Sequence, residues 1–127
     1  MRILLSLYFL FSISSAAEAQ PLYEMRAVWL TTAFGLDWPA NAVGASAQEA
    51  SLRARIREAA DRKLNTVYFQ IVARGDALYP SERLPWSWVL TGTAGGDPGF
   101  DPLAVAVDEA HANGLELHAW YNVYRIQ

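Results

Sequence analysis

TVYFQIVARGDALY, residues 66–79, is a β-branched and aromatic run broken by the polar turn Arg74-Gly75-Asp76. The nearly continuous hydrophobicity of residues 66–71 predicts a parallel strand that is covered on both faces. Residues 72–100 follow as a connection far longer than such strands usually need, which indicates either a functional or a disordered loop. Their aromatic and apolar content favours an ordered loop, so we expect function there.

Two helices are predicted on either side of this stretch. Ser46 and Glu49 have the spacing of a capping box, which predicts a helix from Ser46 to about Lys63. Its apolar stripe is Leu52, Ile56, Ala59 and Ala60, and its charged side chains are expected to face water: Arg53, Arg57, Glu58, Asp61 and Arg62.

The second helix is predicted to start at Asp101, as N-cap, with Pro102 in its first turn, and to stop at Asn113-Gly114. Its buried stripe is expected to be Leu103, Ala106, Val107 and Ala110.

The remaining strands are predicted at residues 25–30 and 115–121. The order is then β-α-β-α-β, an α/β fold with a parallel sheet and right-handed crossovers. No glycine-rich turn opens a helix directly, which disfavours a doubly wound dinucleotide-binding sheet. We therefore expect the N-terminal portion of a (β/α)8 TIM barrel, truncated after the third strand, with its function on the loops that follow the strands.

Residues 1–19 have a basic start, a short apolar stretch and an A-x-A ending, which predict a signal peptide cut between Ala19 and Gln20. The alternative, a membrane anchor, is disfavoured because the apolar stretch is too short to span a bilayer. Residues 20–127 are then expected to be one partial domain, secreted or periplasmic, with no membrane span. The chain has no cysteine, so nothing indicates a disulfide framework.

Charge and histidine content exclude several other classes of partner. The formal net charge is −3 and the basic residues are scattered, which gives no nucleic-acid footprint. His111 and His118 lie on different predicted elements without a spaced partner, so we expect neither a metal nor a cofactor.

Polar and aromatic side chains gather near the predicted strand ends, and each has a structural alternative. His118 either binds a substrate hydroxyl or is satisfied by polar neighbours, and Gln70 either reaches a ligand or bonds a neighbouring strand or loop. Arg74 and Asp76 either contact a ligand or form an ion pair that fixes their loop. The five tryptophans either stack on sugar rings or pack in the core: Trp29, Trp38, Trp86, Trp88 and Trp120.

Several sequence blocks, in one order, carry a resemblance to a known family. They are RAVWLTT (26–32), DWP (37–39), NTVYFQ (65–70), GDALY (75–79), PWS (85–87), LTG (90–92), DPL (101–103), AH (110–111) and HAWYN (118–122). Together they resemble the glycosyl hydrolase-like 10 family, formerly a domain of unknown function, over residues 24–125. Two positions depart from the family pattern: Val72 stands where an arginine is common, and Val123 where a proline is common.

The resemblance implies an exported bacterial TIM-barrel protein that acts on glycosidic bonds in a polysaccharide, with cell-wall glycan strands as the expected substrate. It also implies that catalytic carboxylates lie beyond Gln127, so this fragment alone is expected to be inactive, and Asp76 is its one catalytic candidate. The rival hypothesis is a non-catalytic carbohydrate-binding or inactive fragment. The residues expected to bind substrate are Trp29, Asp37, Gln70, Arg74, Asp76, Tyr79, Trp86, His118, Trp120, Asn122 and Arg125.

Overall fold

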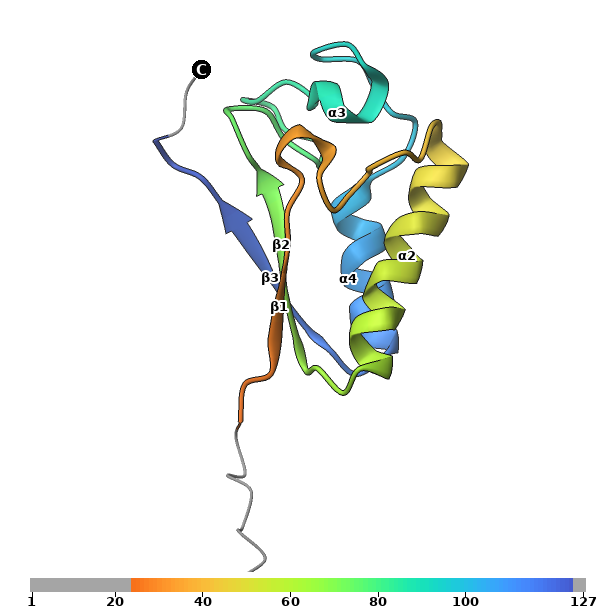
Figure 1. The fold of residues 1–127 in the computed structure, drawn as a ribbon. Coiled ribbons are helices and arrows are strands. Elements are labelled where there is room, and N and C mark those ends of the chain that lie inside the picture. Colours follow the sequence, from red (N-terminus) through yellow and green to blue (C-terminus); the bar gives the residue numbers. More distant parts are fainter. Residues whose placement is uncertain (1–23, 125–127) are drawn as a thin grey trace, which may run out of the picture.

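The computed structural model describes residues 24–124, which form an α/β fold around a parallel sheet. The sheet has three strands in the order β1-β2-β3, as the strand-helix alternation predicts (Figure 1). In chain order the elements are β1 (Ala27–Leu30), the 3₁₀ turn η1 (Ala33–Gly35), α2 (Ala45–Asp61), β2 (Thr66–Val72), α3 (Trp88–Thr91), α4 (Pro102–Ala112) and β3 (Glu116–Tyr121).

Both long helices, α2 and α4, lie side by side on one face of the sheet, and the core fills the space between them and the strands (Figure 1). Val67 and Phe69 of β2 are buried against Leu52 and Ile56 of α2 and against Ala106 of α4. This burial follows from the alternation of side chains along a strand, which turns Val67 and Phe69 toward the helices.

The opposite face of the sheet does not have such a cover within residues 24–124 (Figure 1). Trp29 on that face is 58% exposed, and Tyr68 is only partly buried. β2 itself is nevertheless largely buried, as predicted for a strand covered on both faces, because Tyr68 is the one residue of Thr66–Val72 that is only partly buried. On the side away from the helices the cover comes from neighbouring side chains and loops: Tyr68 packs against the Trp29 ring, and Gln70 is bound by the loop after β1.

The start of α2 differs from the capping box predicted at Ser46. The helix begins at Ala45, and its N-cap is Gly44, whose φ of 85° lies in the region that favours glycine. The carbonyl of Gly44 accepts the first intrahelical bond, from the N–H of Gln48 at 3.0 Å, and no side chain caps the end. Ser46 thus lies inside the first turn, where its hydroxyl is not at the capping position.

The charged face of α2 also differs from the prediction, because it is not entirely a solvated surface. The guanidinium of Arg53 donates to Glu109 of α4 at 3.0 Å, and Arg57 donates to the same carboxylate at 3.2 Å. Glu109 is buried, and its hydrogen bond with Arg53 is the main reason that its pKa is lowered. The same bond raises the pKa of Arg53. These ion pairs tie α2 to α4.

The ends of α4 confirm their predictions. One carboxylate oxygen of Asp101 accepts the N–H groups of Leu103 and Ala104 at 3.0 and 3.1 Å, and Pro102 occupies the first turn. The helix ends before Asn113, and Gly114 has a φ of 70°.

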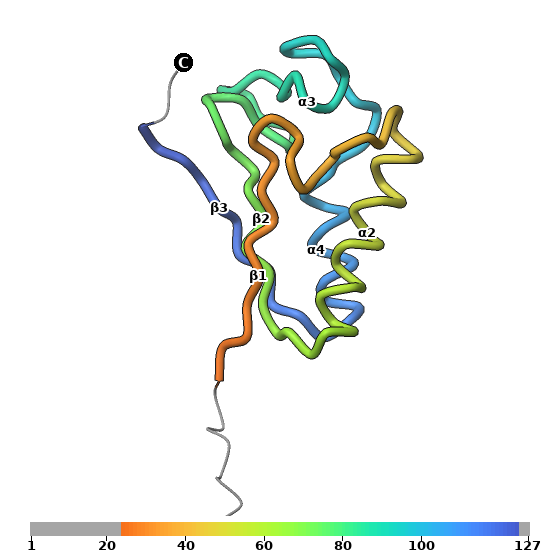
Figure 2. Tube along the Cα trace, in the orientation of Figure 1, coloured from red at the N-terminus to blue at the C-terminus, as the bar shows by residue number. Residues whose placement is uncertain are grey.

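The long connection between β2 and α4 is ordered and folds back on the carboxyl ends of the strands, where it carries the short helix α3 (Figure 2). The N–H of Leu78 donates to the carbonyl of Ile71 at 2.9 Å, and the N–H of Ser87 donates to the carbonyl of Ala77 at 2.9 Å. Ala77 and Leu78 are buried in the core. The loop is thus held by backbone bonds and by its own apolar side chains.

Candidate functional site

The uncovered face of the sheet carries a cluster of rings, which we call the aromatic face: Trp29, Tyr68, His118 and Trp120. The strand register brings three of them into one row, since Trp29 pairs with Tyr68 and Tyr68 pairs with His118. Trp120 lies one step further along β3, paired with Gln70. His118 and Trp120 are two residues apart on β3 and so lie on one face of it, and the register with β2 and β1 brings Tyr68 and Trp29 to the same face.

The rings of the aromatic face contact one another directly. Trp29 stacks on Tyr68 with ring centroids 4.6 Å apart, and it meets Trp120 edge-on at 4.9 Å. The His118 ring lies 5.0 Å from Tyr68. Such pairs contribute about 0.5–1.5 kcal/mol each beyond the area they bury. The cluster is therefore preorganised, and the exposed side of Trp29 offers a flat apolar surface to a ligand.

Polar groups on β3 lie beside these rings. The Nε2 of His118 is 3.3 Å from a carboxylate oxygen of Glu116. The indole N–H of Trp120 donates to Asn122 at 2.9 Å, and the side-chain amide of Asn122 donates to the carbonyl of Ala73 at 3.1 Å. Asn122 thus links the end of β3 to the loop after β2 and orients Trp120.

Gln70 takes the structural alternative considered from the sequence, because its side chain binds a neighbouring loop. It is 2% exposed, and its Oε1 accepts the N–H groups of Thr32 and Ala33, each at 2.9 Å. The hydroxyl of Thr31 donates to the same oxygen at 2.7 Å. Gln70 therefore fixes the loop after β1 against the end of β2.

Asp37 lies in the loop after β1, and one of its oxygens accepts the N–H of Thr31 at 2.9 Å. Its neighbour Trp38 is fully buried and donates its indole N–H to the carbonyl of Gln48 at 3.0 Å, so Trp38 belongs to the core.

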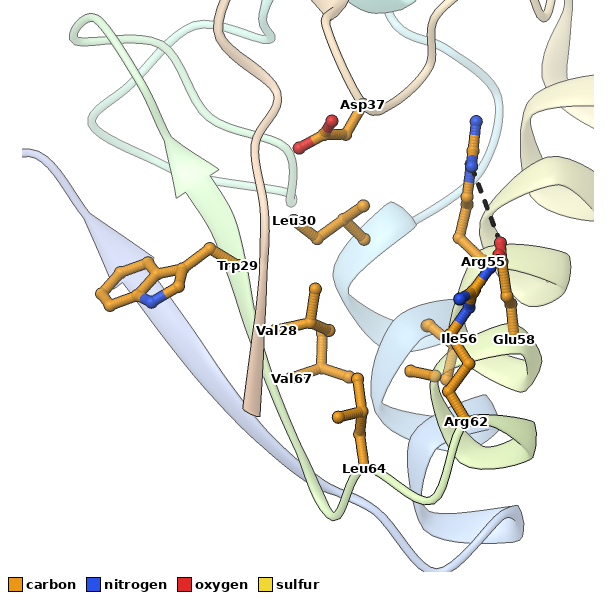
Figure 3. Close-up of a pocket in the computed structure, with 11 residues that line it drawn as sticks. Val28, Trp29, Leu30, Asp37, Arg55, Ile56, Glu58, Arg62, Leu64 and Val67 are labelled. Atoms are coloured by element: carbon orange, nitrogen blue, oxygen red, sulfur yellow. Dashed lines mark hydrogen bonds and ion pairs between the residues drawn. The ribbon is translucent and has the colours of Figure 1, made fainter. Parts of the chain in front are cut away.

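Asp37 also lines a pocket of about 220 Å³ between the free edge of β1 and α2. Figure 3 shows Val28 and Leu30 directed into this pocket and the Trp29 indole directed to the other side of β1. The rest of the lining is largely aliphatic, apart from charged residues of α2, where Arg55 pairs with Glu58 at 3.7 Å. The lining contains two carboxylates, Asp37 and Glu58, and that of Glu58 is paired with Arg55 and Arg62 of the same helix region.

Asp76 joins two parts of the long loop. One of its oxygens accepts the N–H of Arg74 at 3.3 Å, and the other accepts the hydroxyl of Ser87 at 2.6 Å. Ser87 is buried and immediately precedes α3. The carboxylate of Asp76 is half-buried at the carboxyl end of β2, next to α3.

The other predicted site residues lie in different surroundings. Tyr79 and Trp86 are partly buried and pack against the hydrophobic core, which is the alternative to sugar stacking. Arg125 and the predicted cleavage point between Ala19 and Gln20 lie outside the described residues.

Arg74 lies among aromatic rings that the sequence analysis did not include in the site. Its guanidinium carbon is 4.7 Å from the centroid of the Phe34 ring and 5.3 Å from that of Trp88. Phe34 lies four residues after the end of β1. It could therefore have been proposed as a site residue, because the other candidates were also chosen for lying near the ends of strands. From the sequence, Trp88 could either stack on a sugar ring or pack in the core. Its place beside Arg74 depends on how the loop folds back on the sheet, which the sequence pattern does not show.

Residues 24–124 contain no group of three histidine, aspartate or glutamate side chains placed to hold a metal ion. Among the helices of this same range, none has the length and apolar character needed to cross a bilayer.

These features define the class of protein: an α/β protein whose polar and aromatic loops gather at the carboxyl ends of parallel strands. The chain belongs to the glycosyl hydrolase-like 10 family, which it matches over residues 24–126.

Curated relatives carry names of the same kind. The chain is 40% identical over 119 residues to glycosyl hydrolase YngK of Bacillus subtilis (strain 168), which covers 93% of this chain and 23% of YngK. It is 42% identical over 121 residues to glycosyl hydrolase DigH of Escherichia coli (strain K12), which covers 87% of this chain and 27% of DigH. The chain therefore spans about a quarter of the length of these relatives.

Proposed function

We propose that the full-length natural protein containing this chain is an exported glycoside hydrolase that acts on a polysaccharide, with bacterial cell-wall glycan strands as its substrate. The observation that carries the proposal is the aromatic face, in which exposed and partly buried rings contact one another beside polar groups of β3. Sugar rings have apolar faces and hydroxyl edges, so they match a surface of flat rings bordered by hydrogen-bonding groups.

In this proposal the chain forms the first strand-helix units of a (β/α)8 barrel, and the aromatic face looks into the barrel mouth. Support comes from the parallel order β1-β2-β3, with both long helices on one face of the sheet. Catalytic carboxylates are then contributed by later strands, and Asp76 is the candidate from this part of the chain. Export rests on the signal sequence at residues 1–19, and an intact mass beginning at Gln20 for the secreted protein is the expected result.

The test is glycan cleavage by the full-length natural protein, measured as soluble fragments released from peptide-free wall glycan strands. Trp29→Ala and Trp120→Ala are each expected to lower kcat/KM by about tenfold, because stacking contributes about 1 kcal/mol or more. Val43→Ala, which alters an exposed apolar side chain before α2, is the control and should leave cleavage unchanged. Unaltered cleavage by both tryptophan variants would remove the aromatic face from the site.

The second candidate is carbohydrate binding without hydrolysis. The observation in its favour is that Asp37 and Asp76 both hold loop groups through hydrogen bonds, as structural carboxylates do. Binding of wall glycans by the full-length protein with no release of fragments would favour this candidate. If fragments are released, Asp76→Asn distinguishes a catalytic role from a structural one: abolished cleavage with retained glycan binding indicates the former.

A further inference from the structure

Another pocket, of about 530 Å³, lies between the start of α2 and the segment that contains α3, and we call it the α2–α3 pocket. Part of its wall is apolar and consists of Val89, Leu90 and Pro98. It is open to solvent, because Gly92 and Asp97 in its lining are exposed. None of its lining residues belongs to the aromatic face, so the pocket is a separate place on the molecule.

Gln48 of α2 is buried at the wall of this pocket and has an unpaired acceptor oxygen. Its side chain donates from Nε2 to the carbonyls of Ala42 at 3.2 Å and Leu90 at 2.8 Å, and both of these residues line the pocket. Because both neighbours are acceptors, exchanging the amide nitrogen and oxygen would break these bonds. Within residues 24–124, the buried Oε1 of Gln48 has no hydrogen-bond partner. A buried acceptor of this kind is unfavourable unless a donor reaches it.

The start of α2 adds hydrogen-bond donors to the same pocket. The first intrahelical bond comes from the N–H of Gln48, so the N–H groups of Ala45, Ser46 and Ala47 precede it. No side chain caps this end, and the first turn has no acidic residue. Gly44 and Ala45 line the pocket. This end of the helix therefore offers it donors and the positive end of the helix dipole.

The charges around the pocket disfavour ionic ligands of either sign. The carboxylate of Asp97, which lines the pocket and accepts the N–H of Gly99 at 2.8 Å, repels an anion. The positive end of α2 repels a cation. A neutral group that both donates to Gln48 Oε1 and accepts from the N–H of Ala45 satisfies both sides, and a hydroxyl does this.

We propose that the α2–α3 pocket binds a neutral polyhydroxy compound, either a polyol or a monosaccharide unit. One hydroxyl pairs with Gln48 Oε1 and the start of α2, a second donates to Asp97, and the C–H groups contact Val89 and Pro98. Several hydroxyls on one carbon frame are required, because the donors and acceptors of the pocket come from separate segments. The site goes beyond the proposed function, and its occupant is a free polyol or one unit of a glycan chain.

The experiment measures ligand binding to the full-length natural protein by saturation-transfer NMR titrations. The neutral probes are glycerol, glucose and a linear oligosaccharide of glucose, and the charged probes are sodium acetate and methylammonium chloride. Glucose is expected to bind saturably with a Kd of about 1 mM, and the ions are expected not to compete with it. Tighter binding of glucose than of the oligosaccharide supports a free polyol as the occupant, and the reverse order supports a glycan unit.

Ala45→Pro removes one N–H group from the pocket and keeps the helix, because proline is favoured at the first helical position. It is expected to weaken glucose binding about threefold to tenfold, as the loss of one hydrogen bond does. Ala45→Gly retains the N–H at the same position and is the matched control, with binding within about twofold of wild type. Gln48→Met removes the acceptor oxygen and should weaken glucose binding about tenfold or more.

Absence of saturable binding by all three neutral probes would leave water as the partner of Gln48 and overturn the inference. Equal glucose affinity in the wild-type protein and Ala45→Pro would also overturn it, and so would competition by acetate. A loss in Trp29→Ala without a loss in Ala45→Pro would move the sugar to the aromatic face. Glycan cleavage is measured separately, so the proposed function stands or fails independently. If thermal unfolding shows that Gln48→Met does not fold, Ala45→Pro decides the outcome.

Discussion

The two faces of the sheet differ in what the same strands present. Toward α2 and α4, β2 places Val67 and Phe69, which are 1% and 0% exposed. Toward the other side, β1 and β3 place Trp29 and His118, which are exposed, around a partly buried Tyr68. One face is closed by apolar side chains packed under the helices, and the other holds rings that contact mainly one another.

This difference suggests that one face of the sheet contributes mainly to the stability of the fold and the other mainly to ligand binding. Apolar side chains stabilise the fold when they are removed from water, and on this sheet that removal is complete only on the side that the helices cover. Large rings that stay accessible to water contribute less to the free energy of folding, but their exposed apolar area remains available to a ligand. Substitutions on the two faces should therefore differ in how much they lower the free energy of unfolding.

Phe69→Ala should cause the largest loss, about 3–5 kcal/mol in the free energy of unfolding, because it empties a fully buried site beside Trp38. Trp29→Ala on the open face should cost about 1 kcal/mol, since it removes ring contacts without opening a core cavity. Urea unfolding of the full-length protein measures both. Similar losses for the two variants would mean that the aromatic face is buried as a second core in the whole protein.

Gln70→Ala should cost about 2–3 kcal/mol, although Gln70 lies on the face of the sheet away from the helices. Its removal leaves two N–H groups without their acceptor, that of the buried Thr32 and that of the partly buried Ala33. Gln70→Glu retains an acceptor at the same position and is the matched variant. Urea unfolding checks this prediction. A loss of less than about 0.5 kcal/mol in the free energy of unfolding, as is usual for a substitution at an exposed position, would contradict the role assigned to Gln70.

Asp101→Ala should cost about 1 kcal/mol, because it deletes the N-cap of α4 on the closed side of the sheet. Asp101→Asn preserves the accepting oxygen and should recover most of the loss. A thermal melt of each variant provides the measurement, and equal destabilisation by alanine and asparagine would argue against capping.

The smallest effect is expected from the ion pairs between α2 and α4. The pKa of Glu109 is lowered in the folded protein, so its contribution is present above the ordinary glutamate pKa of 4.5 and is lost as pH falls through the folded value. Glu109→Gln should therefore flatten the stability profile below about pH 5. Glu58→Gln, which removes the exposed pairs with Arg55 and Arg62, is the control. An unchanged acid profile in Glu109→Gln would contradict the assignment.

Local patterns sufficed for much of the fold. The strand-helix order, the Asp101 cap and the stop at Asn113-Gly114 depend on interactions within a few residues, so the sequence shows them directly. The start of α2 was mispredicted because Ser46 has the right spacing for a capping box, whereas Gly44 takes the N-cap position with a positive φ. Spacing alone does not reveal whether Gly44 or Ser46 occupies the N-cap position.

The α/β order, the family resemblance and the position of polar and aromatic residues near strand ends can all be read from the sequence. Which of those residues are exposed and which bind loops depends on how the chain packs. Gln70 and Glu109 meet partners 38 and 56 residues away, Thr32 and Arg53. Phe34, Arg74 and Trp88 form one stack only because three chain segments converge. Such long-range contacts depend on how the packed helices, strands and loops are aligned with one another. The periodicity of a short stretch of sequence does not contain that information.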